Sequence, residues 1–393
     1  MLAYPDALAI VLAQRRDWGT QRVGLAEAAG RVLAEPIVAD RDLPPFDRVA
    51  MDGFAIDHAA YAAGHRHFRV AGIQAAGEPA SPLPAPDTCL EVMTGAALPR
   101  GANTVVRYER LRREGDVVEV TAEVRAGADV HPRAADAAAG DELAARGRRI
   151  GLAEVGLLAS CGFAEVRVQR LPRIAIAATG TELVSADSAV EPHQIRASNL
   201  AQLAYLLAGA APEQHLLRDD PAVLRERLGD LLARCELLVL SGGVSRGRYD
   251  YVPEVLAELG VERLFQGVAQ RPGKPLWVGR TDRALVVGLP GNPLAAVACA
   301  VAYLGPWLRT TRGLDAAPPH VPLAVAVPPR GDLTLLQSVA LDPAGRATPV
   351  RYNGSGDLTG LLRADGLAIL PGGRPDGYRA GEAYPYLPFQ PLI

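Results

Sequence analysis

Apolar and polar residues alternate along the chain in patterns that divide it into regions of different secondary structure. From Arg173 onward, short apolar runs alternate with segments of helical period, and we expect strands at RIAIAA, EQHLL, LLVL and ALVVGL. Strands that alternate with helices of ten or more residues indicate a parallel sheet with helices on both faces. The sequence therefore predicts a central parallel α/β domain over residues 171–315.

Two other regions contain strand-like runs without a helical period. Between 46 and 136, runs such as HFRVAGI and NTVVRYE are separated by glycine and proline clusters, which predicts a small β domain. Runs such as LTLLQSVAL and LAILPGG predict a terminal β domain over 316–393. The helical spacing of the first forty residues and of 151–160 predicts that 1–45 and 137–170 form one helical and β N-terminal domain, into which the β domain is inserted.

Length and charge narrow the possible partners. The chain has 393 residues, of which 49% are apolar and 22% charged, and its net charge is −3. Several domains are expected at this length, since one domain typically has roughly 100–200 residues. Nucleic acids and anionic membranes select basic surfaces, so we expect neither as the main partner. An anionic ligand would have to be held by a local cluster of donors.

Cysteine usage and the apolar runs indicate the compartment. The four cysteines are far apart, without a C-x-x-C pair: Cys89, Cys161, Cys235 and Cys299. This spacing suits reduced thiols better than a disulfide or zinc framework. The N-terminal segment lacks the basic lead of a signal peptide. The longest apolar run, 294–308, falls short of the roughly 20 residues that span a bilayer and predicts a buried helix. We expect a cytoplasmic protein.

The predicted central strands end in loops that are rich in glycine or polar residues. In an open parallel sheet, ligands bind beyond the carboxyl ends of the strands. Glycine lets the main chain approach a ligand closely, and helix N-termini attract oxyanions. We therefore expect a site for a phosphate or a nucleotide, with Glu182 and Asp250 as ligands of a bridging Mg²⁺ ion. The residues expected to bind this anion are Thr179, Gly180, Asp219, Asp220, Ser241, Gly242, Gly243, Ser245, Pro290, Gly291 and Asn292.

Each of these loops also has a structural interpretation. A glycine pair after a strand can be a tight turn, Asp220 can cap the helix that follows, and PGNP can be a turn with an N-cap. The helix expected at SNLAQLAYLLAGA would be capped by Ser198 or Asn199. The chain has no P-loop motif and no convincing GxGxxG after a strand, so P-loop and Rossmann cofactor sites lack support.

Two further motifs have candidate chemistry. QRPGKPLWVG places Arg271 and Lys274 on a rigid turn, which suits a small oxyanion, although a solvated turn would have the same sequence. In LPPFDRVAMDGFAI, the pair Asp52–Gly53 is typical of a hairpin turn. Its apolar neighbours would instead suit a buried functional acid, and the pattern leaves both possibilities open.

Together, these motifs resemble the molybdopterin molybdenumtransferases, the MoeA-type enzymes to which the E domain of gephyrin is related. The motifs are LPPFDRVAMDGFAI, EVMTGAALPRGANTVV, ATGTEL, RDDP, LSGGVSRGRYDYV, RPGKP, GLPGNPLAAV and NGSGDLTGLLRADGLAILPGG. The resemblance covers residues 5–390. It implies an elongated homodimer of four-domain subunits, with a MogA/MoaB-like central domain and a cleft shared between subunits. It also implies insertion of molybdate into adenylylated molybdopterin, with Mg²⁺ and release of AMP.

The resemblance also implies roles for individual residues. The catalytic residues of the family match Asp52, Thr94, Glu182 and Asp250, and its molybdate ligands match Arg271, Lys274 and Ser355. A further acid of the family matches Asp136. The sequence departs from many relatives, which have lysine at positions 267 and 271, where this chain has Gly267 and Arg271. Some relatives have serine at 295, where this chain has Ala295, and the usual Gly-Glu-Asp is Ala134-Ala135-Asp136 here. For an arginine expected in the C-terminal domain, Arg351 is one candidate.

Two other functions remain open at this point. A molybdopterin adenylyltransferase would share the ATGTEL and SGGVSRGRYD loops, but it would lack PPFDRVAMDG and the additional domains. A non-enzymatic scaffold like gephyrin normally has an added domain and linker, which this sequence lacks. As partners, the resemblance implies a molybdopterin adenylyltransferase and the enzymes that receive the cofactor.

Overall fold

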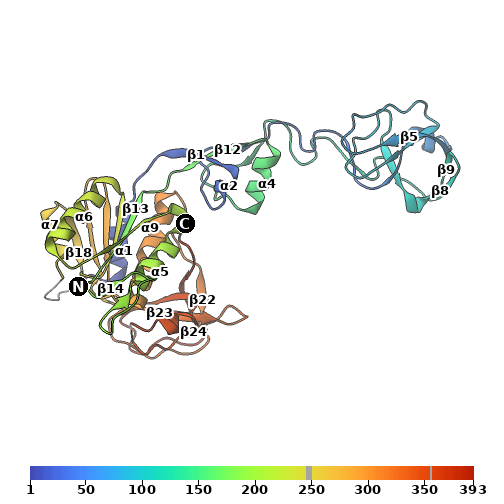
Figure 1. The fold of residues 1–393 in the computed structure, drawn as a ribbon. Coiled ribbons are helices and arrows are strands. Elements are labelled where there is room, and N and C mark those ends of the chain that lie inside the picture. The colour runs from blue at the N-terminus through green and yellow to red at the C-terminus, as the bar shows by residue number, and fades with distance from the viewer. Residues whose placement is uncertain (245–249, 355) are drawn as a thin grey trace. The chain divides into compact units, whose positions relative to one another are not determined.

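The computed structural model describes residues 1–244, 250–354 and 356–393, which form two compact units (Figure 1). Unit 1 comprises Met1–Gln21, Gly30–Val32 and Arg167–Ile393. Unit 2 comprises Arg22–Ala29 and Leu33–Val166. Each unit has its own apolar core and is described separately below.

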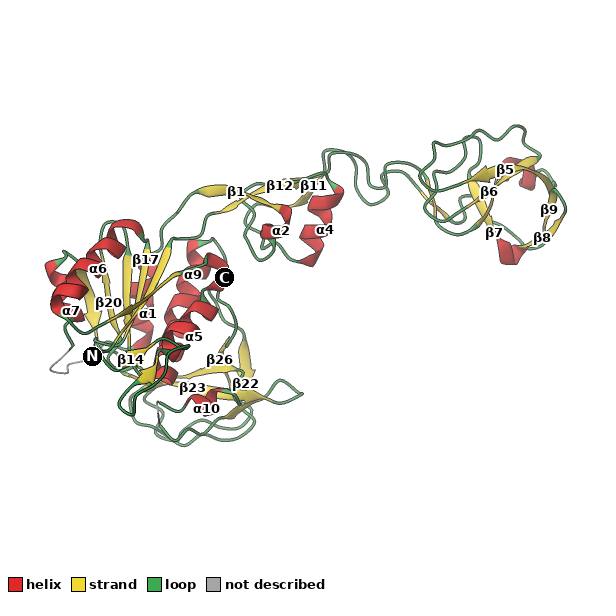
Figure 2. Cartoon of the chain, viewed as in Figure 1, coloured by secondary structure: helices red, strands yellow, loops and turns green. Residues whose placement is uncertain are grey.

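The main sheet of unit 1 confirms the predicted α/β architecture and extends it (Figure 2). Its strands follow the order β16 (Glu213–Leu217), β13 (Ile174–Thr179), β17 (Leu237–Ser241), β21 (Leu285–Leu289), β20 (Trp277–Arg280) and β18 (Glu262–Gln266). The first four strands are parallel. The last two are antiparallel to their neighbours, which the sequence pattern did not predict.

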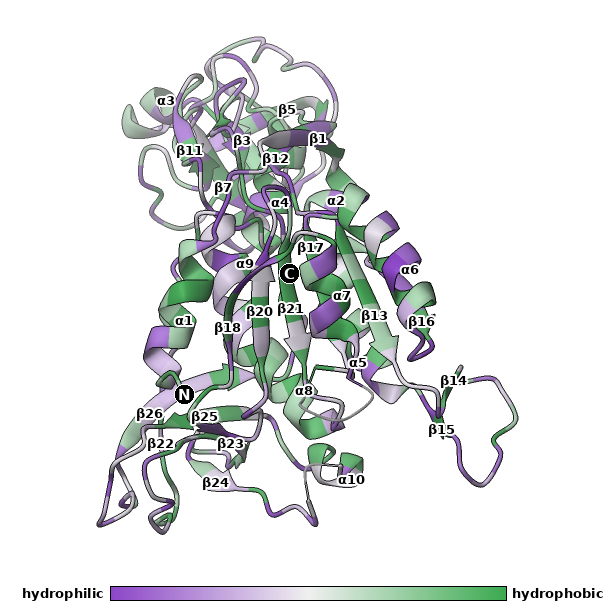
Figure 3. Ribbon diagram, turned by 90° about the vertical axis from the view of Figure 1, so that its left-hand side faces the viewer, coloured by the Kyte–Doolittle hydropathy of each residue, from purple (hydrophilic) through white to green (hydrophobic). Residues whose placement is uncertain are grey.

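Helices cover both faces of this sheet, and the strand residues alternate between the two cores. Leu237 and Val239 of β17 lie in the core formed with α1 (Tyr4–Ala13), α5 (Ser198–Leu206), α8 (Pro293–Cys299) and α9 (Gly305–Thr311). Leu238 and Leu240 lie in the opposite core, with α6 (Pro221–Arg234) and α7 (Val252–Glu258). Burial on both faces explains why these strands are continuous apolar runs, as the colouring of β13, β17 and β21 illustrates (Figure 3).

The long apolar run 294–308 is a buried helix, as predicted from the sequence. It consists of α8, a π-helical segment η3 (Ala300–Leu304) and α9, and residues 294–308 are all buried. Within the described residues, no helix combines the length and the apolar character that crossing a membrane requires.

The second sheet of unit 1 is built mainly from the C-terminal segment. It contains β19 (Gln270–Arg271), β23 (Thr334–Leu341), β25 (Gly366–Leu370), β26 (Ala383–Pro388) and β22 (His320–Pro322), with β24 (Ala347–Pro349) paired to β23. The short helix α10 (Leu358–Leu361) and the two-strand ribbon β14 (Leu183–Val184) and β15 (Ile195–Arg196) complete the unit. Because β19 pairs with β23, the Arg271–Lys274 turn lies where the α/β region meets this sheet.

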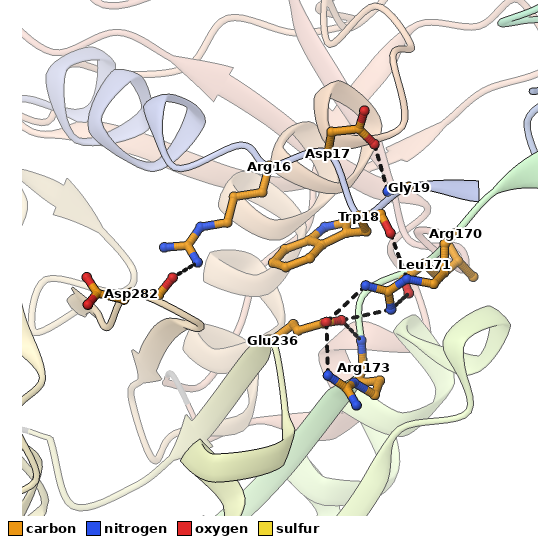
Figure 4. Close-up of polar contacts among 9 residues, drawn as sticks. All are labelled: Arg16, Asp17, Trp18, Gly19, Arg170, Leu171, Arg173, Glu236 and Asp282. Carbon is orange, nitrogen blue, oxygen red and sulfur yellow. Dashed lines mark hydrogen bonds and ion pairs between the residues drawn. The ribbon is translucent and has the colours of Figure 1, made fainter. Parts of the chain in front are cut away.

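A buried carboxylate stabilises the end of the main sheet at which β17 begins (Figure 4). Glu236 accepts two hydrogen bonds of 2.9 Å from the Arg170 guanidinium, and further bonds from the main-chain amide and the side chain of Arg173. Arg170 also donates to the carbonyl of Trp18 at 2.8 Å. Burial alone would raise the pKa of Glu236, but the bonds from the two arginines hold it below its usual range.

Unit 2 is dominated by a six-stranded sheet with the order β7 (Thr104–Arg107), β4 (Gly53–Ile56), β6 (Thr88–Val92), β5 (His67–Gln74), β9 (Val117–Val120) and β8 (Leu111–Glu114). The short helices α3 (His58–Ala62) and η1 (Tyr108–Arg110) accompany it. The remaining elements are β2 (Ile37–Val38) paired with β11 (Glu142–Ala144), β3 (Arg48–Val49) paired with β10 (Val130–His131), and the helices α2 (Leu25–Ala28) and α4 (Leu152–Ser160). The returning segment therefore packs with the N-terminal one. β1 (Thr20–Gly24) pairs with β12 (Glu165–Gln169) where the chain passes between the units.

The first helix packs in a different part of the protein from the one expected. The sequence pattern placed residues 1–45 in the N-terminal domain, but α1 packs into the core of unit 1, where the Tyr4 ring contacts the Tyr303 ring edge-on at 5.5 Å. The apolar spacing of α1 predicts a buried face without identifying its partner. The second expected helix ends at Ala28, and Val32 and Leu33 are not helical.

Candidate functional site

The loops singled out from the sequence lie side by side along one edge of the main sheet. Thr179 at the end of β13 is paired with Leu217 at the end of β16, and Ser241 at the end of β17 is paired with Leu289 at the end of β21. Since β13 and β17 are also neighbours, the four strand ends are adjacent. This edge is where ligands bind in open α/β sheets.

The glycine pair after β17 is required by packing against Thr179. Gly242 and Gly243 have φ of 94° and 66°. A Cβ on Gly242 would lie 2.4 Å from the Thr179 carbonyl oxygen, and one on Gly243 would lie 2.7 Å from the Thr179 hydroxyl. The Gly242 amide donates to the Leu289 carbonyl, and the Gly180 amide to the Leu217 carbonyl, both at 3.2 Å. These two amides therefore bond within the protein, and the glycines bring neighbouring strand ends together.

Asn199 links two of the loops, a role that the sequence did not reveal. Its side-chain amide donates to the Ser241 hydroxyl at 2.8 Å and to the Gly291 carbonyl at 2.7 Å. The expectation that Ser198 or Asn199 caps α5 is wrong, because the N-cap is Ala197, without a side-chain cap. The oxygen of the Asn199 amide is buried without a hydrogen-bond partner and is available to a ligand donor.

Asp219 is the most perturbed acid at this edge. Burial raises the pKa of its carboxyl group, the Thr181 amide lowers it, and the nearby charges of Glu182 and Asp250 raise it further, with a net increase. The Thr179 side chain also lowers this pKa through a hydrogen bond, and both Asp219 Oδ1 and the Thr179 hydroxyl are buried. Perturbed acids of this kind are common at functional sites.

Asp220 has a structural role. Its carboxylate accepts hydrogen bonds from the amides of Ala222 and Val223, at 2.9 and 3.0 Å, and so caps α6, which begins with Pro221. The structure therefore confirms the alternative interpretation, in which Asp220 is a helix cap.

The acids Glu182, Asp219 and Asp250 suit a hard cation by their chemistry. All three offer carboxylate oxygens, the ligands that Mg²⁺ prefers. Glu182 and Asp250 are close enough to Asp219 to shift its pKa. Among the described residues, however, no three histidine, cysteine or acidic side chains form a ready metal cluster. The three carboxylates are therefore of the right chemical type for Mg²⁺, but they are not arranged as a complete coordination site.

A cavity of about 900 Å³ lies between the α/β region and the C-terminal sheet of unit 1. Pro290 and Asn292 of the β21 loop line it, so it adjoins the strand ends. The cationic residues in its wall are Arg271, Lys274, Arg330 and Arg351. The described part of its lining contains no carboxylate. A cavity with several cations and no acid favours a small dianion or a phosphate.

The C-terminal sheet contributes residues that the sequence pattern did not single out. Arg330 is one, since an arginine in a loop carries no positional signal. Ser338 and Tyr352 also line the cavity, and their hydroxyl oxygens are buried next to each other, where the Ser338 side chain lowers the pKa of Tyr352 through a hydrogen bond. Burial is the main reason why the pKa of Tyr352 is raised. Ser355 and Ser245, both expected at the site, lie outside the described residues.

In unit 2, Asp52 and Thr94 form a pair. Asp52 accepts hydrogen bonds from the Thr94 hydroxyl at 2.7 Å and the Thr94 amide at 2.6 Å, and these bonds lower the pKa of the Asp52 carboxyl group. Asp52 is exposed, so it is not the buried acid that its neighbours suggested. Gly53 begins β4, where a Cβ would lie 2.1 Å from the Val106 carbonyl oxygen. Asp136, the further acid matched to the family, has its Oδ1 3.1 Å from His131 Nε2.

Family models match most of the chain. Residues 2–162 match "MoeA N-terminal region (domain I and II)", 175–310 match "Probable molybdopterin binding domain", and 320–389 match "MoeA C-terminal region (domain IV)".

Similar proteins match over nearly the whole length. A molybdopterin molybdenumtransferase of Synechocystis is 35% identical over 98% of this chain and 99% of the relative. One from Bacillus subtilis is 32% identical over 92% of this chain and 88% of the relative. Among solved structures, the molybdopterin biosynthesis MoeA protein from Pyrococcus horikoshii matches with a TM-score of 0.79 and 26% identity, over 99% of both chains.

Proposed function

The chain belongs to the molybdopterin molybdenumtransferase family, and on this premise we propose that it inserts molybdate into adenylylated molybdopterin with release of AMP. It is an enzyme of molybdenum cofactor biosynthesis. The observation that carries the proposal is the juxtaposition of a cationic cavity with the carboxyl ends of the parallel strands. The cationic cavity suits an oxyanion, and the strand ends suit an organic phosphate.

Molybdate is the proposed occupant of the cationic cavity. It is a dianion, so a site must offer charged donors that compete with water. Arg271 and Lys274 provide two such donors from the turn, and Arg330 and Arg351 provide two from loops of the C-terminal segment. Ser355, which matches a molybdate ligand of the family, would add a hydroxyl.

Adenylylated molybdopterin is the proposed ligand of the strand ends. Asn199 fixes the loops after β17 and β21 relative to each other, so the two strand ends have a defined arrangement at the proposed phosphate site. Thr179 and Asp219 contribute buried polar oxygens at the same strand ends, which suit donor groups of the organic substrate. The reaction breaks the phosphoanhydride bond between AMP and molybdopterin.

Glu182 and Asp250 are the proposed holders of Mg²⁺, with Asp219 beside them. The ion would supply positive charge to the phosphate oxygens of the substrate. Because no closed cage exists among the described acids, substrate phosphates would complete the coordination, as is usual for this ion. Asp219, whose pKa is raised, is the acid best suited to carry a proton.

Asp52 and Thr94 are proposed to act in a homodimer, from the partner subunit's unit 2, at a shared cleft. The support is their match to catalytic residues of the family and the exposure of the hydrogen-bonded Asp52 carboxylate. We further propose that the enzyme is cytoplasmic. A molybdopterin adenylyltransferase would supply its substrate, and molybdoenzymes would receive its product.

Single-turnover assays test this function. The protein would be mixed with adenylylated molybdopterin, Mg²⁺ and molybdate, and AMP and the molybdenum content of the pterin product would be measured. We expect one AMP released for each molybdenum inserted. Consumption of ATP with unmodified molybdopterin would instead identify an adenylyltransferase. Absence of both reactions, together with tight binding of a protein partner, would favour a scaffold.

A further inference from the structure

The cationic turn rests on a buried side chain that does not belong to the cavity wall. Gln270 precedes Arg271 and is 1% exposed. Its Nε2 donates to the carbonyl oxygen of Gly273 at 3.2 Å and lies 3.4 Å from the Cys299 sulfur. The side chain thus reaches across the turn and bonds the main chain just before Lys274.

The other end of the same amide is also bonded. Gln270 Oε1 accepts a hydrogen bond of 2.6 Å from the hydroxyl of Tyr303, which is fully buried. Tyr303 belongs to the π-helical segment η3, an irregularity that often occurs near functional sites. Its ring also contacts Tyr4 of α1. The amide therefore connects the turn to the central helix of unit 1.

Packing leaves the turn little freedom to shift toward this helix. Gly273 has a φ of 94°, and a Cβ there would lie 2.2 Å from the Cys299 sulfur and 2.8 Å from Gln270 Nε2. The Gly273 carbonyl also accepts a bond from the Leu276 amide at 3.1 Å, and the Val268 amide donates to the Lys274 carbonyl at 2.9 Å. Main-chain bonds fix one side of the turn, and Gln270 fixes its centre.

We propose that Gln270 is a positioning residue for oxyanion binding, which holds Arg271 and Lys274 at the cavity through Gly273 and is itself oriented by Tyr303. This inference rests on the proposed function of the cavity. A bound dianion gains most from donors that are already in place, because ordering them during binding costs conformational entropy. Loss of the amide should therefore weaken molybdate binding more than it affects the organic substrate.

The test measures equilibrium binding of molybdate, and the KM values of both substrates, in Gln270→Met and Tyr303→Phe. Methionine has a similar length to glutamine but cannot form either hydrogen bond. We expect an approximately tenfold weaker affinity for molybdate in Gln270→Met and a smaller change of the same sign in Tyr303→Phe. The KM of adenylylated molybdopterin and the kcat at saturating molybdate should stay within about twofold of the wild type. If Gln270→Met does not fold, Tyr303→Phe alone decides.

Two control variants separate the possible outcomes. Leu308→Ala removes a fully buried side chain from α9 and should lower the melting temperature without changing the affinity for molybdate. Lys274→Ala should lose molybdate binding. Wild-type affinity in both Gln270→Met and Tyr303→Phe, or equal weakening of both substrates, would overturn the role of Gln270. If Lys274→Ala binds molybdate as the wild type does, the cavity assignment fails, and the inference fails with it.

Discussion

Thr94 holds the Asp52 carboxylate through two hydrogen bonds, one from its hydroxyl group and one from its main-chain amide. The hydroxyl bond is the largest cause of the lowered pKa of Asp52. We expect Thr94→Val, which preserves shape without the hydroxyl, to raise the pKa of Asp52 part of the way to its usual range. Thr94→Ser should leave it low. Titration of the Asp52 carboxyl carbon by NMR measures this difference.

The sign of the associated pH effect follows from the lowered pKa. A carboxyl group with a folded-state pKa below its unfolded value, about 3.9 for aspartate, stabilises the fold above that value, and this contribution is lost as the pH falls through the lower folded pKa. Thr94→Val should therefore lose part of this stabilisation at neutral pH. An identical pKa of Asp52 in the wild type and both variants would contradict the interpretation.

The Glu236 carboxylate accepts bonds from two arginines in a buried position, so its removal should destabilise unit 1. We expect Glu236→Gln to cost about 2 kcal/mol at neutral pH, since hydrogen bonds to charged groups contribute about 1.5–3 kcal/mol. Because the pKa of Glu236 is lowered, its stabilisation is present above the unfolded pKa of about 4.3 and is lost as the pH falls through the folded value. Thermal unfolding between pH 3 and 7 measures this difference.

An exposed pair provides the control for Glu236. Glu262 accepts a bond of 2.8 Å from Arg280 at the sheet edge, and both side chains are largely exposed. Glu262→Gln should change the free energy of unfolding by less than about 1 kcal/mol. Equal effects of the two substitutions would show that the burial of Glu236 does not matter.

Substitution of Gly242 should distort the ligand edge. In Gly242→Ala, the methyl group would meet the Thr179 carbonyl oxygen at 2.4 Å, and the residue would keep a φ of 94°. Strain from the positive φ costs roughly 1–2 kcal/mol and overpacking about 1–3 kcal/mol more. Chemical denaturation measures the combined loss of stability, and AMP binding should weaken with it.

The matched control for Gly242 is Gly260→Ala. Gly260 has a φ of 80° but nothing within 4 Å of an added Cβ. It should lose only the roughly 1–2 kcal/mol of backbone strain. If Gly242→Ala is no more destabilising than Gly260→Ala, the tight approach to Thr179 is not a constraint on the fold.

The ionised Asp219 carboxylate should lower the free energy of unfolding, although the residue is proposed to act in the reaction. Its pKa is raised mainly by burial, so the ionised carboxylate destabilises the folded state once the pH exceeds the unfolded pKa. Asp219→Asn should therefore unfold at a higher temperature than the wild type at pH 7. The difference should vanish below about pH 3.9, where both states are protonated.

Activity provides the second measurement on Asp219. Asp219→Asn should lose most AMP release, whereas Asp230→Asn, on the exposed surface of α6, should change neither activity nor melting temperature appreciably. A lower melting temperature for Asp219→Asn at pH 7 would contradict the prediction, because it would mean that the charged form stabilises the fold.

Arg330 tests the cationic cavity independently of the turn. Arg330→Gln should weaken molybdate binding at least tenfold, because a charge-assisted hydrogen bond contributes about 1.5–3 kcal/mol and 1.4 kcal/mol corresponds to a factor of ten. Isothermal titration with molybdate measures the change. Arg379→Gln removes a charge from an exposed position of the C-terminal segment outside the cavity lining and should bind molybdate normally.

The strand ends were predictable from the sequence because burial on both faces makes a strand visible as an apolar run. Once LLVL and ALVVGL are placed in one parallel sheet, Ser241 and Pro290 must lie at the same edge. The N-cap of α6 was also predictable, because an aspartate followed by a proline is a local signal for the start of a helix. In the structure, Asp220 is that cap and Pro221 is the first helical residue.

Other parts of the site depend on contacts between distant segments, which carry no local signal. Asn199 looked like a helix cap, but it bonds residues 42 and 92 positions away. Arg330 lines the cavity four residues before β23, the strand that pairs with β19. The antiparallel strands β18 and β20 have five and four residues, and neither shows the alternating burial of an amphipathic strand, so the sequence pattern did not reveal them. The four-domain boundaries inferred from the sequence stay a prediction.

The packing of Tyr4 against Tyr303 joins two segments that are translated far apart in time during synthesis. Unit 2, whose residues end at Val166, can leave the ribosome and fold while α1 still lacks its partner helix. At roughly 5–20 residues per second, α1 waits about 15–60 s for Tyr303 to be translated. During that interval the apolar face of α1, including Ala7 and Val11, lacks those residues of its native core that have not yet been translated.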